Sequence, residues 1–160
     1  LVLKALNVKF PGYVVFSAEE QIFQPIDETP SEYDYKGFLD LVIQTPDGKY
    51  HIIDWKSCSW GWDMQRRTDR ITTYQLTYYK NFFCQKHNID PKNVETHFGL
   101  LKRTAKKDKI EIFKVSSGPR KIKNALKVLN KAVYNIHNNN HPKNKLKCGK
   151  CEFRNTEYCP

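Results

Sequence analysis

The alternation of apolar and polar residues in the first third of the chain predicts a β-hairpin. Residues 37–44 and 50–55 are two apolar runs rich in β-branched side chains, and residues 45–48 between them, with the sequence Thr-Pro-Asp-Gly, are a strong turn signal. Such runs, joined by a short loop with glycine, are typical of antiparallel strand pairs. A further strand is predicted over residues 20–26. The first part of the fold is therefore expected to be a strand followed by an antiparallel hairpin.

The remaining apolar positions switch between helical and strand spacing. Aromatic and apolar side chains recur every three or four residues over 72–86, which predicts a helix, and residues 94–101 and 109–115 are predicted strands. Pro119, which suits the first turn of a helix, begins a second, amphipathic helix. The expected core stripe of this helix consists of Ile122, Leu126, Leu129, Val133 and Ile136. The order of elements predicts an α/β (α+β) fold in which helices flank a central mixed β-sheet.

Length and composition indicate one globular domain. A chain of 160 residues suits a single core over residues 1–160, with residues 141–160 as a cysteine-containing tail. No apolar run approaches the roughly 18 residues that a membrane span needs, so no span is expected. Lysine and arginine number 27 against 17 acidic residues, a net charge of +10, which favours a polyanionic partner. Nucleic acid and an anionic membrane surface both fit this charge.

The predicted hairpin places two carboxylates opposite each other. A three-residue loop pairs Thr45 with Lys49, and counting outward from this pair sets Asp40 against Asp54. Their Cβ atoms would then lie about 4.5–5.5 Å apart, unless a bulge at the turn shifts the register by one residue. Because strand residues alternate between faces, Lys56 shares the face of Asp54.

Two carboxylates in an apolar setting indicate a cation site. Like charges that face each other in a sheet are destabilising, and burial adds to the cost. A hard divalent cation such as Mg²⁺ removes the repulsion, because it takes carboxylate oxygens together with water and phosphate as ligands. The ammonium of Lys56 would then orient the metal-bound water, assist its deprotonation by the metal or neutralise charge on the phosphate. The alternative is an edge hairpin with one exposed aspartate and an ordinary Asp-x-Lys pair, but the apolar flanks and the facing Asp40 favour the cation.

Three short motifs, taken in order, resemble a known nuclease family. They are Gly37-Phe38-Leu39-Asp40, Ile52-Ile53-Asp54-Trp55-Lys56 and Gln75-Leu76-Thr77-Tyr78-Tyr79. A Gly-x-x-Asp strand, an Asp/Glu-x-Lys strand and a following Gln-x-x-x-Tyr helix mark the RecB-type branch of the PD-(D/E)XK nucleases. The chain is similar to this branch over residues 20–159, and phage exonuclease-like members are the most similar in character. The resemblance implies a restriction-endonuclease-like core.

The resemblance also implies roles for the motif residues. The implied catalytic residues are Asp40, Asp54, Lys56, Gln75 and Tyr79. The two aspartates would bind Mg²⁺ or Mn²⁺ together with the backbone carbonyl of Trp55, and the lysine would act on the attacking water. Gln75 and Tyr79, one helical turn apart, would face the site and contact DNA or the water. Without the hairpin, these two positions would suit a surface amide beside a core aromatic.

One metal ligand of the family has no clear counterpart in this chain. Members often supply a further ligand, commonly a histidine, from a helix before the first strand, but no histidine precedes His51. Glu20 is the best substitute carboxylate. A surface residue at the start of a strand, beside Glu19, is an equally good interpretation of Glu20.

Cys148, Cys151 and Cys159 form a second group of candidate ligands near the end of the chain. The spacing of the first two lets both thiolates reach one metal ion. Some relatives hold an iron–sulfur cluster with one early and three late cysteines, and these three resemble the late group, although a matching early cysteine is absent. A 4Fe-4S cluster, Zn²⁺ with His141 or a residue outside the chain as fourth ligand, and reduced cysteines without metal are the alternatives. We predict that the three sulfurs lie close together and hold the tail against the core.

The segment after the second hairpin strand interleaves aromatic and arginine side chains. Residues 57–73 contain Trp60, Trp62, Arg66, Arg67 and Arg70. Such side chains suit stacking on unpaired bases and contact with phosphates, so Trp60 and the three arginines are candidate DNA-binding residues. The alternative is a partly packed loop with solvated arginines.

Together these features predict a metal-dependent DNA nuclease that hydrolyses phosphodiester bonds in recombination, repair or replication. Exonuclease or flap-type action is the first expectation. A structure-specific endonuclease or resolvase of the same superfamily, and a non-catalytic DNA-binding module, are the alternatives. The expected partners are DNA and other replication or recombination proteins, with no membrane. An odd count of 5 cysteines without a visible secretion signal favours a reducing compartment, and we expect the cytoplasm of a bacterial or phage-infected cell.

Overall fold

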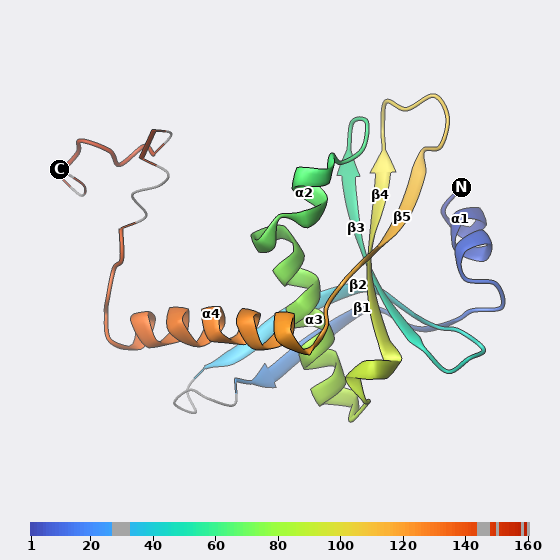
Figure 1. Ribbon diagram of the computed structural model, residues 1–160, viewed down its shortest axis with the longest axis horizontal. Coiled ribbons are helices and arrows are strands. Elements are labelled where there is room, and N and C mark those ends of the chain that lie inside the picture. Colours follow the sequence, from blue (N-terminus) through green and yellow to red (C-terminus); the bar gives the residue numbers. More distant parts are fainter. Residues whose placement is uncertain (27–32, 144–147, 150, 158, 160) are drawn as a thin grey trace.

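Five strands form one sheet in the order in which they follow along the chain (Figure 1). The computed structural model describes residues 1–26, 33–143, 148–149, 151–157 and 159. The strands are β1 (Val14–Pro25), β2 (Asp34–Gln44), β3 (Tyr50–Cys58), β4 (Val94–Lys102) and β5 (Ile110–Val115). Neighbouring strands are antiparallel except β3 and β4, which are parallel. The predicted α+β fold, a central mixed sheet with flanking helices, is confirmed.

The β2–β3 hairpin has the turn and the register that its sequence predicts. The N–H of Thr45 donates a hydrogen bond to the carbonyl oxygen of Lys49 over 2.9 Å, and Gly48 has the positive φ, 81°, that this turn requires. No bulge interrupts the pairs that follow, so the ladder keeps this register to its last pair. It ends one residue before Asp40 and Asp54.

The parallel pairing of β3 with β4 requires a crossover connection, and helices supply it. The connection consists of α2 (Met64–Thr68), α3 (Arg70–His87) and the 3-10 helix η1 (Pro91–Asn93). Asp63 and Asp69 begin the two α-helices by accepting hydrogen bonds from backbone N–H groups of the first turn, and Asn88, with a φ of 52°, ends α3. α3 contacts β1, β2, β3 and β4, so it covers one face of the sheet. The helix predicted over 72–86 lies within α3, whereas α2 was not predicted.

α4 (Pro119–His137) packs beside α3 and begins with proline, as its sequence predicts. The hydroxyl of Tyr78 in α3 donates a hydrogen bond to the carbonyl oxygen of Ala125 over 2.9 Å. The predicted core stripe is right for Val133, which is buried, but wrong for Ile136, which is 65% exposed. The reason is that the C-terminal end of α4 extends past the sheet (Figure 1). None of the described helices combines the length and the apolar character that crossing a membrane requires.

A short helix that the sequence pattern did not indicate, α1 (Val2–Lys9), lies on the other side of the sheet from α3 (Figure 1). Leu6 and Phe10 pack there against Ile43 and Ile53 in a second, smaller core cluster. The larger cluster lies between the sheet and α3. Leu6 is the one buried residue of α1, so the spacing of its apolar residues gives too weak a helical signal to detect. The sheet is therefore covered on both faces.

Truncation of Leu6 tests the packing of α1, because this side chain is 3% exposed. We expect Leu6→Ala to lower the free energy of unfolding by about 2–5 kcal/mol, as large-to-small changes in cores do. Leu3 on the same helix is 70% exposed, and Leu3→Ala is the matched control. It should change the free energy of unfolding by less than about 0.5 kcal/mol. Urea unfolding measures both values, and equal effects would show that α1 does not pack on the sheet.

Candidate active site

The C-terminal end of β3 carries a buried carboxylate beside an ammonium group. Asp54 is 2% exposed, and by strand alternation it lies on the face that α3 covers, as does Ile52. Lys56 follows on the same face, and its Nζ lies 2.8 Å from Oδ2 of Asp54. The side chain of Lys56 is 33% exposed, so its ammonium also reaches the solvent.

Asp40 joins these two residues at the point where the pairing of β2 with β3 ends. Its Oδ2 accepts a hydrogen bond from the backbone N–H of Trp55 over 2.7 Å. Leu39 packs in the cluster under α3, whereas Leu41 packs in the cluster under α1, so the regular alternation of β2 is broken at Asp40. This break directs the carboxylate of Asp40 toward the end of β3, beside Asp54.

Burial and neighbouring charge make Asp54 a costly anion. Burial raises the pKa of Asp54, the ion pair with Lys56 opposes this rise, and the charge of Asp40 adds to it. No group among the described residues gives Oδ2 of Asp54 a hydrogen bond of normal geometry, and Lys56 faces it as an ion pair. A divalent cation at the two carboxylates would offset both penalties, so this donor set fits Mg²⁺ or Mn²⁺.

α3 brings Gln75 and Tyr79 to the same place. Nε2 of Gln75 donates a hydrogen bond to the hydroxyl oxygen of Tyr79 over 3.0 Å. Burial raises the pKa of Tyr79, and the negative charges of Asp54 and Asp40 raise it further. The phenol therefore lies within electrostatic reach of both carboxylates, as the motif resemblance implies.

Gly37 sets how closely β2 approaches α3 at this site. A Cβ atom at Gly37 would come within 2.9 Å of the ring of Tyr79, closer than a side chain can be placed without moving the ring. The sequence motif contains this glycine three residues before Asp40, but its spacing alone gives no sign of the contact with α3.

Glu20 is held by two side chains at the C-terminal end of α3. Its Oε1 lies 2.7 Å from Nζ of Lys86 and 2.6 Å from Nε2 of His87. Burial raises the pKa of Glu20, but the hydrogen bonds from Lys86, Ser17 and His87 outweigh this and lower it overall. These contacts favour a structural ion pair between β1 and α3. A metal-binding role for Glu20 stays a prediction, and α1, the helix before the first strand, contains no histidine.

The four residues predicted to bind DNA have different surroundings. Trp60 is 74% exposed, and Arg66 and Arg70 are exposed as well. Arg67 is half-buried, and its guanidinium donates a hydrogen bond to Glu111 of β5 over 2.6 Å. Arg67 therefore fixes α2 to the sheet, while the other three side chains are accessible to a ligand. DNA contact by any of the four stays a prediction.

The cysteines of the tail do not form a ligand group in the described part of the chain. Cys148 and Cys159 are half-buried and Cys151 is exposed. Among the described residues, the one group of three or more ligating side chains with atoms within 4.8 Å of one another lies in β3 and β4. Figure 1 shows the described tail residues beyond the end of α4, and the expected packing of the tail on the core is not found there. Residues 144–147, 150, 158 and 160 lie outside the described chain, and metal binding by the tail stays a prediction.

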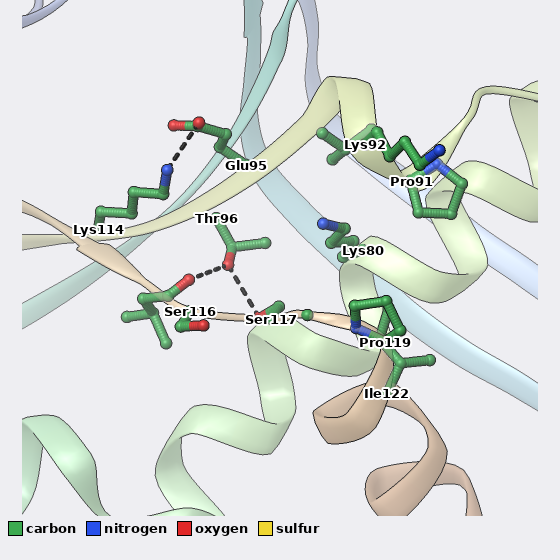
Figure 2. Close-up of a pocket in the computed structure, with 13 residues that line it drawn as sticks. Lys80, Pro91, Lys92, Glu95, Thr96, Lys114, Ser116, Ser117, Pro119 and Ile122 are labelled. Atoms are coloured by element: carbon green, nitrogen blue, oxygen red, sulfur yellow. Dashed lines mark hydrogen bonds and ion pairs between the residues drawn. The ribbon is translucent and has the colours of Figure 1, made fainter.

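A separate pocket lies between α3, the start of β4 and the N-terminal end of α4 (Figure 2). It has a volume of about 260 Å³, and three lysines, Lys80, Lys92 and Lys114, are among its lining residues. Two of its lining hydroxyls, those of Thr96 and Ser117, lie 3.1 Å apart. None of the predicted catalytic residues lines it, so this pocket is distinct from the candidate active site.

A second group of candidate metal ligands, which the sequence did not reveal, lies in β3 and β4. It consists of His51, Glu95 and His97. The three residues come together because β3 and β4 are parallel neighbours. Such a pairing between strands about forty residues apart has no local sequence signal, whereas the hairpin pairing does.

The raised pKa of Asp54 predicts how its replacement changes stability without metal. A carboxyl group with a raised folded-state pKa supplies stability below its ordinary pKa of 3.8 and loses it as pH rises through the folded-state pKa. In EDTA, Asp54→Asn should therefore be more stable than the wild type at pH 7, and the difference should vanish below about pH 4.

Asp47→Asn is a control of opposite sign for this experiment. The hydrogen bond from Thr45 lowers the pKa of Asp47, so this substitution should reduce stability at pH 7. Urea unfolding of the three proteins across pH measures both differences. A wild type more stable than Asp54→Asn at pH 7 would contradict the assignment of Asp54 as a destabilised carboxylate.

Comparison with known proteins places this site in a family. The family model described as the PD-(D/E)XK nuclease superfamily matches residues 6–160. The crystal structure of SSO0001 is similar in fold, with 17% sequence identity and a TM-score of 0.55 over 95% of this chain and 63% of that chain. This chain thus spans less than two thirds of the length of SSO0001. No curated protein sequence matches the chain. The family match, together with the sheet and the positions of its motif residues, shows that the chain belongs to the PD-(D/E)XK nuclease superfamily.

Proposed function

We propose that the protein is a metal-dependent deoxyribonuclease whose active site lies at the C-terminal end of β3. The observation that carries the proposal is the burial of Asp54 beside Asp40 and Lys56, because buried, neighbouring carboxylates are costly unless a cation binds there. Asp40, Asp54 and the backbone carbonyl of Trp55 would hold Mg²⁺ or Mn²⁺. When bound, such a cation lowers the pKa of water and neutralises charge on the phosphate.

Lys56 holds its protons close to the reacting groups. Without metal, its Nζ pairs with Oδ2 of Asp54 at 2.8 Å. An ammonium has three N–H donors, so Nζ keeps its contact with Asp54 while it donates to the attacking water or to a phosphate oxygen. Its role is to orient that water and to offset negative charge as the phosphorus is attacked.

Gln75 and Tyr79 position the substrate from α3. The raised pKa of Tyr79 keeps its hydroxyl protonated at neutral pH, so it acts as a hydrogen-bond donor. Its oxygen already accepts the hydrogen bond from Gln75, which leaves the O–H to donate to a phosphate oxygen. Because Gly37 has no side chain, the ring of Tyr79 can lie close against β2, in the position from which its O–H would reach the phosphate.

The charge of the chain and its exposed arginines support DNA as the substrate. The net charge is +10. Arg66 and Arg70 are exposed, and both follow the exposed Trp60 within ten residues of the sequence. Guanidinium groups and an indole ring together suit phosphate contact and base stacking. Arg67 contributes less to this surface, because Glu111 binds its guanidinium.

The finer activity is proposed from the resemblance of the motifs. Their RecB-type, phage exonuclease-like character favours exonuclease or flap-type cleavage in recombination, repair or replication. This would take place in the cytoplasm of a bacterial or phage-infected cell, beside other proteins of those processes. End-labelled linear DNA and closed circular DNA test it: an exonuclease degrades the linear DNA alone, an endonuclease or resolvase also cuts suitable circles, and a non-catalytic module cuts neither.

Replacement of Asp54 should abolish cleavage. Wild-type protein should cleave end-labelled DNA with Mg²⁺ or Mn²⁺ and lose this activity in EDTA, because the carboxylates alone activate no water. Asp54→Asn should lie at the background rate with either cation. Asp47→Asn, which changes an exposed aspartate of the same hairpin, should retain wild-type turnover. Wild-type turnover in EDTA, or full activity of Asp54→Asn, is incompatible with the proposal.

Replacement of Lys56 should separate chemistry from binding. Lys56→Ala should lower turnover by roughly 10²–10⁴-fold, the usual contribution of a positioned proton donor or acceptor. Its affinity for DNA should change little, and the slope of affinity against salt should fall by at most about one phosphate contact. Lys49→Ala in the hairpin turn is the control with unchanged turnover. Near wild-type cleavage by Lys56→Ala would remove this lysine from the mechanism.

A further inference from the structure

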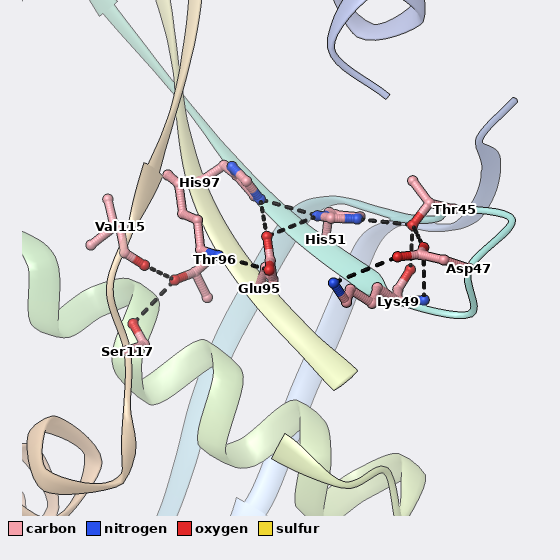
Figure 3. Close-up of polar contacts among 10 residues, drawn as sticks. Thr45, Asp47, Lys49, His51, Glu95, Thr96, His97, Val115 and Ser117 are labelled. Carbon is pink, nitrogen blue, oxygen red and sulfur yellow. Dashed lines mark hydrogen bonds and ion pairs between the residues drawn. The ribbon is translucent and has the colours of Figure 1, made fainter. Parts of the chain in front are cut away.

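Two histidines and a glutamate converge on the sheet face opposite the candidate active site (Figure 3). His51 lies in β3 and is paired with Glu95 of β4, and His97 follows two residues along β4. All three side chains lie on the face that α1 covers, because Phe10 at the end of that helix packs on both histidines, and Glu95, two residues before His97 on β4, points to the same face. The ring centroid of Phe10 is 4.6 Å from that of His51 and 5.1 Å from that of His97.

The ligand atoms of this cluster have the spacing of a metal site. Nδ1 of His51 lies 3.1 Å from Nε2 of His97, and Oε2 of Glu95 lies 3.8 and 3.9 Å from these two nitrogens. Ligand atoms around a tetrahedral Zn²⁺, at its usual Zn–N and Zn–O distances, lie roughly 3.3–3.5 Å from one another. Movements of a few tenths of an ångström would therefore let all three atoms bind one cation.

The hairpin turn fixes which nitrogen of His51 faces the cluster. The hydroxyl of Thr45 donates a hydrogen bond to the carboxylate of Asp47, so its oxygen is free to accept one from Nε2 of His51, 3.0 Å away. Nε2 then carries the proton, and Nδ1 presents its lone pair to Glu95 and His97. Outer groups that orient a histidine in this way are typical of metal sites.

Nδ1 of His51, Oε2 of Glu95 and Nε2 of His97 face one another, and a single N–H proton lies among these three atoms. Nζ of Lys114 binds Oε1 of Glu95 at 2.7 Å, which leaves Oε2 directed at the histidines. Burial lowers the pKa of His97 to about 3 and also lowers that of His51, so both rings are neutral, the form in which imidazole binds metal. Without a cation, the single N–H at Nε2 of His97 faces both Nδ1 of His51 and Oε2 of Glu95. A cation would pair with the lone pairs of Nδ1 of His51, Nε2 of His97 and Oε2 of Glu95, and the proton of His97 would move to its Nδ1, which is buried without a hydrogen-bond partner among the described residues.

We propose that His51, Glu95 and His97 bind one Zn²⁺ ion, separate from the catalytic cation. Two imidazole nitrogens and one carboxylate favour Zn²⁺ over Mg²⁺ or Ca²⁺, which prefer oxygen ligands. Three protein ligands leave the fourth position for water. The ion would link β3, the strand that carries Asp54, to β4. Its role is therefore to stabilise the strands that support the active site.

Zinc binding by the full chain tests the proposal. The other candidate zinc ligands are first removed by changing Cys148, Cys151 and Cys159 to serine. Calorimetric titration should then show one equivalent of Zn²⁺, with a rise in Tm on saturation. The Co²⁺-loaded protein should show d–d absorption without a thiolate charge-transfer band. Glu95→Gln, which alters a half-buried side chain, should weaken binding at least about tenfold and remove the rise in Tm.

Three further variants make the outcome decisive. His97→Asn should lose binding as Glu95→Gln does. Lys114→Met, which removes the ion pair of Glu95 but no ligand, should retain the site, and so should Asp54→Asn. The proposal is overturned if the protein with the three tail cysteines changed to serine binds no Zn²⁺, or if its binding survives both Glu95→Gln and His97→Asn. Loss of binding in Asp54→Asn would also overturn it, because the ion would then belong to the active site.

Discussion

The burial of the Asp54 carboxylate at the end of β3 is the constraint on which the rest of the site depends. A carboxylate that is 2% exposed needs compensating charge, and Lys56, two residues further along the same strand face, supplies part of it at 2.8 Å. Asp40 then adds a second negative charge, which raises the pKa of Asp54. The protein keeps this unfavourable arrangement in its folded core, and a divalent cation would turn the same arrangement into a binding site.

The hairpin and its register could be predicted because the information is local. A three-residue turn with glycine in the left-handed region fixes which residues pair, and the period of two then determines which side chains share a face. That reasoning placed Asp54 and Lys56 on one face, and set Asp40 opposite Asp54. It did not anticipate the break in alternation between Leu39 and Leu41, which directs Asp40 toward the end of β3.

Features that depend on contacts between distant segments could not be predicted. The parallel pairing of β3 with β4 unites His51 with His97, and no residue pattern near either histidine signals it. Arg67 looks like a DNA-binding side chain in sequence, but Glu111 of β5 binds it in the fold. The helical stripe of α4 correctly indicated amphipathicity, yet Ile136 is exposed because the sheet ends before the helix does.

The same strand, β3, thus presents carboxylate chemistry to α3 on one face and imidazole chemistry to α1 on the other. Diffraction from crystals grown with Mn²⁺ tests the central claim, that Asp40 and Asp54 share one divalent cation, because the anomalous signal locates the ion directly. We predict a peak that contacts both carboxylates and the carbonyl oxygen of Trp55. Ordered Asp40 and Asp54 side chains with no anomalous peak between them, in crystals where Mn²⁺ occupies other sites, would contradict it.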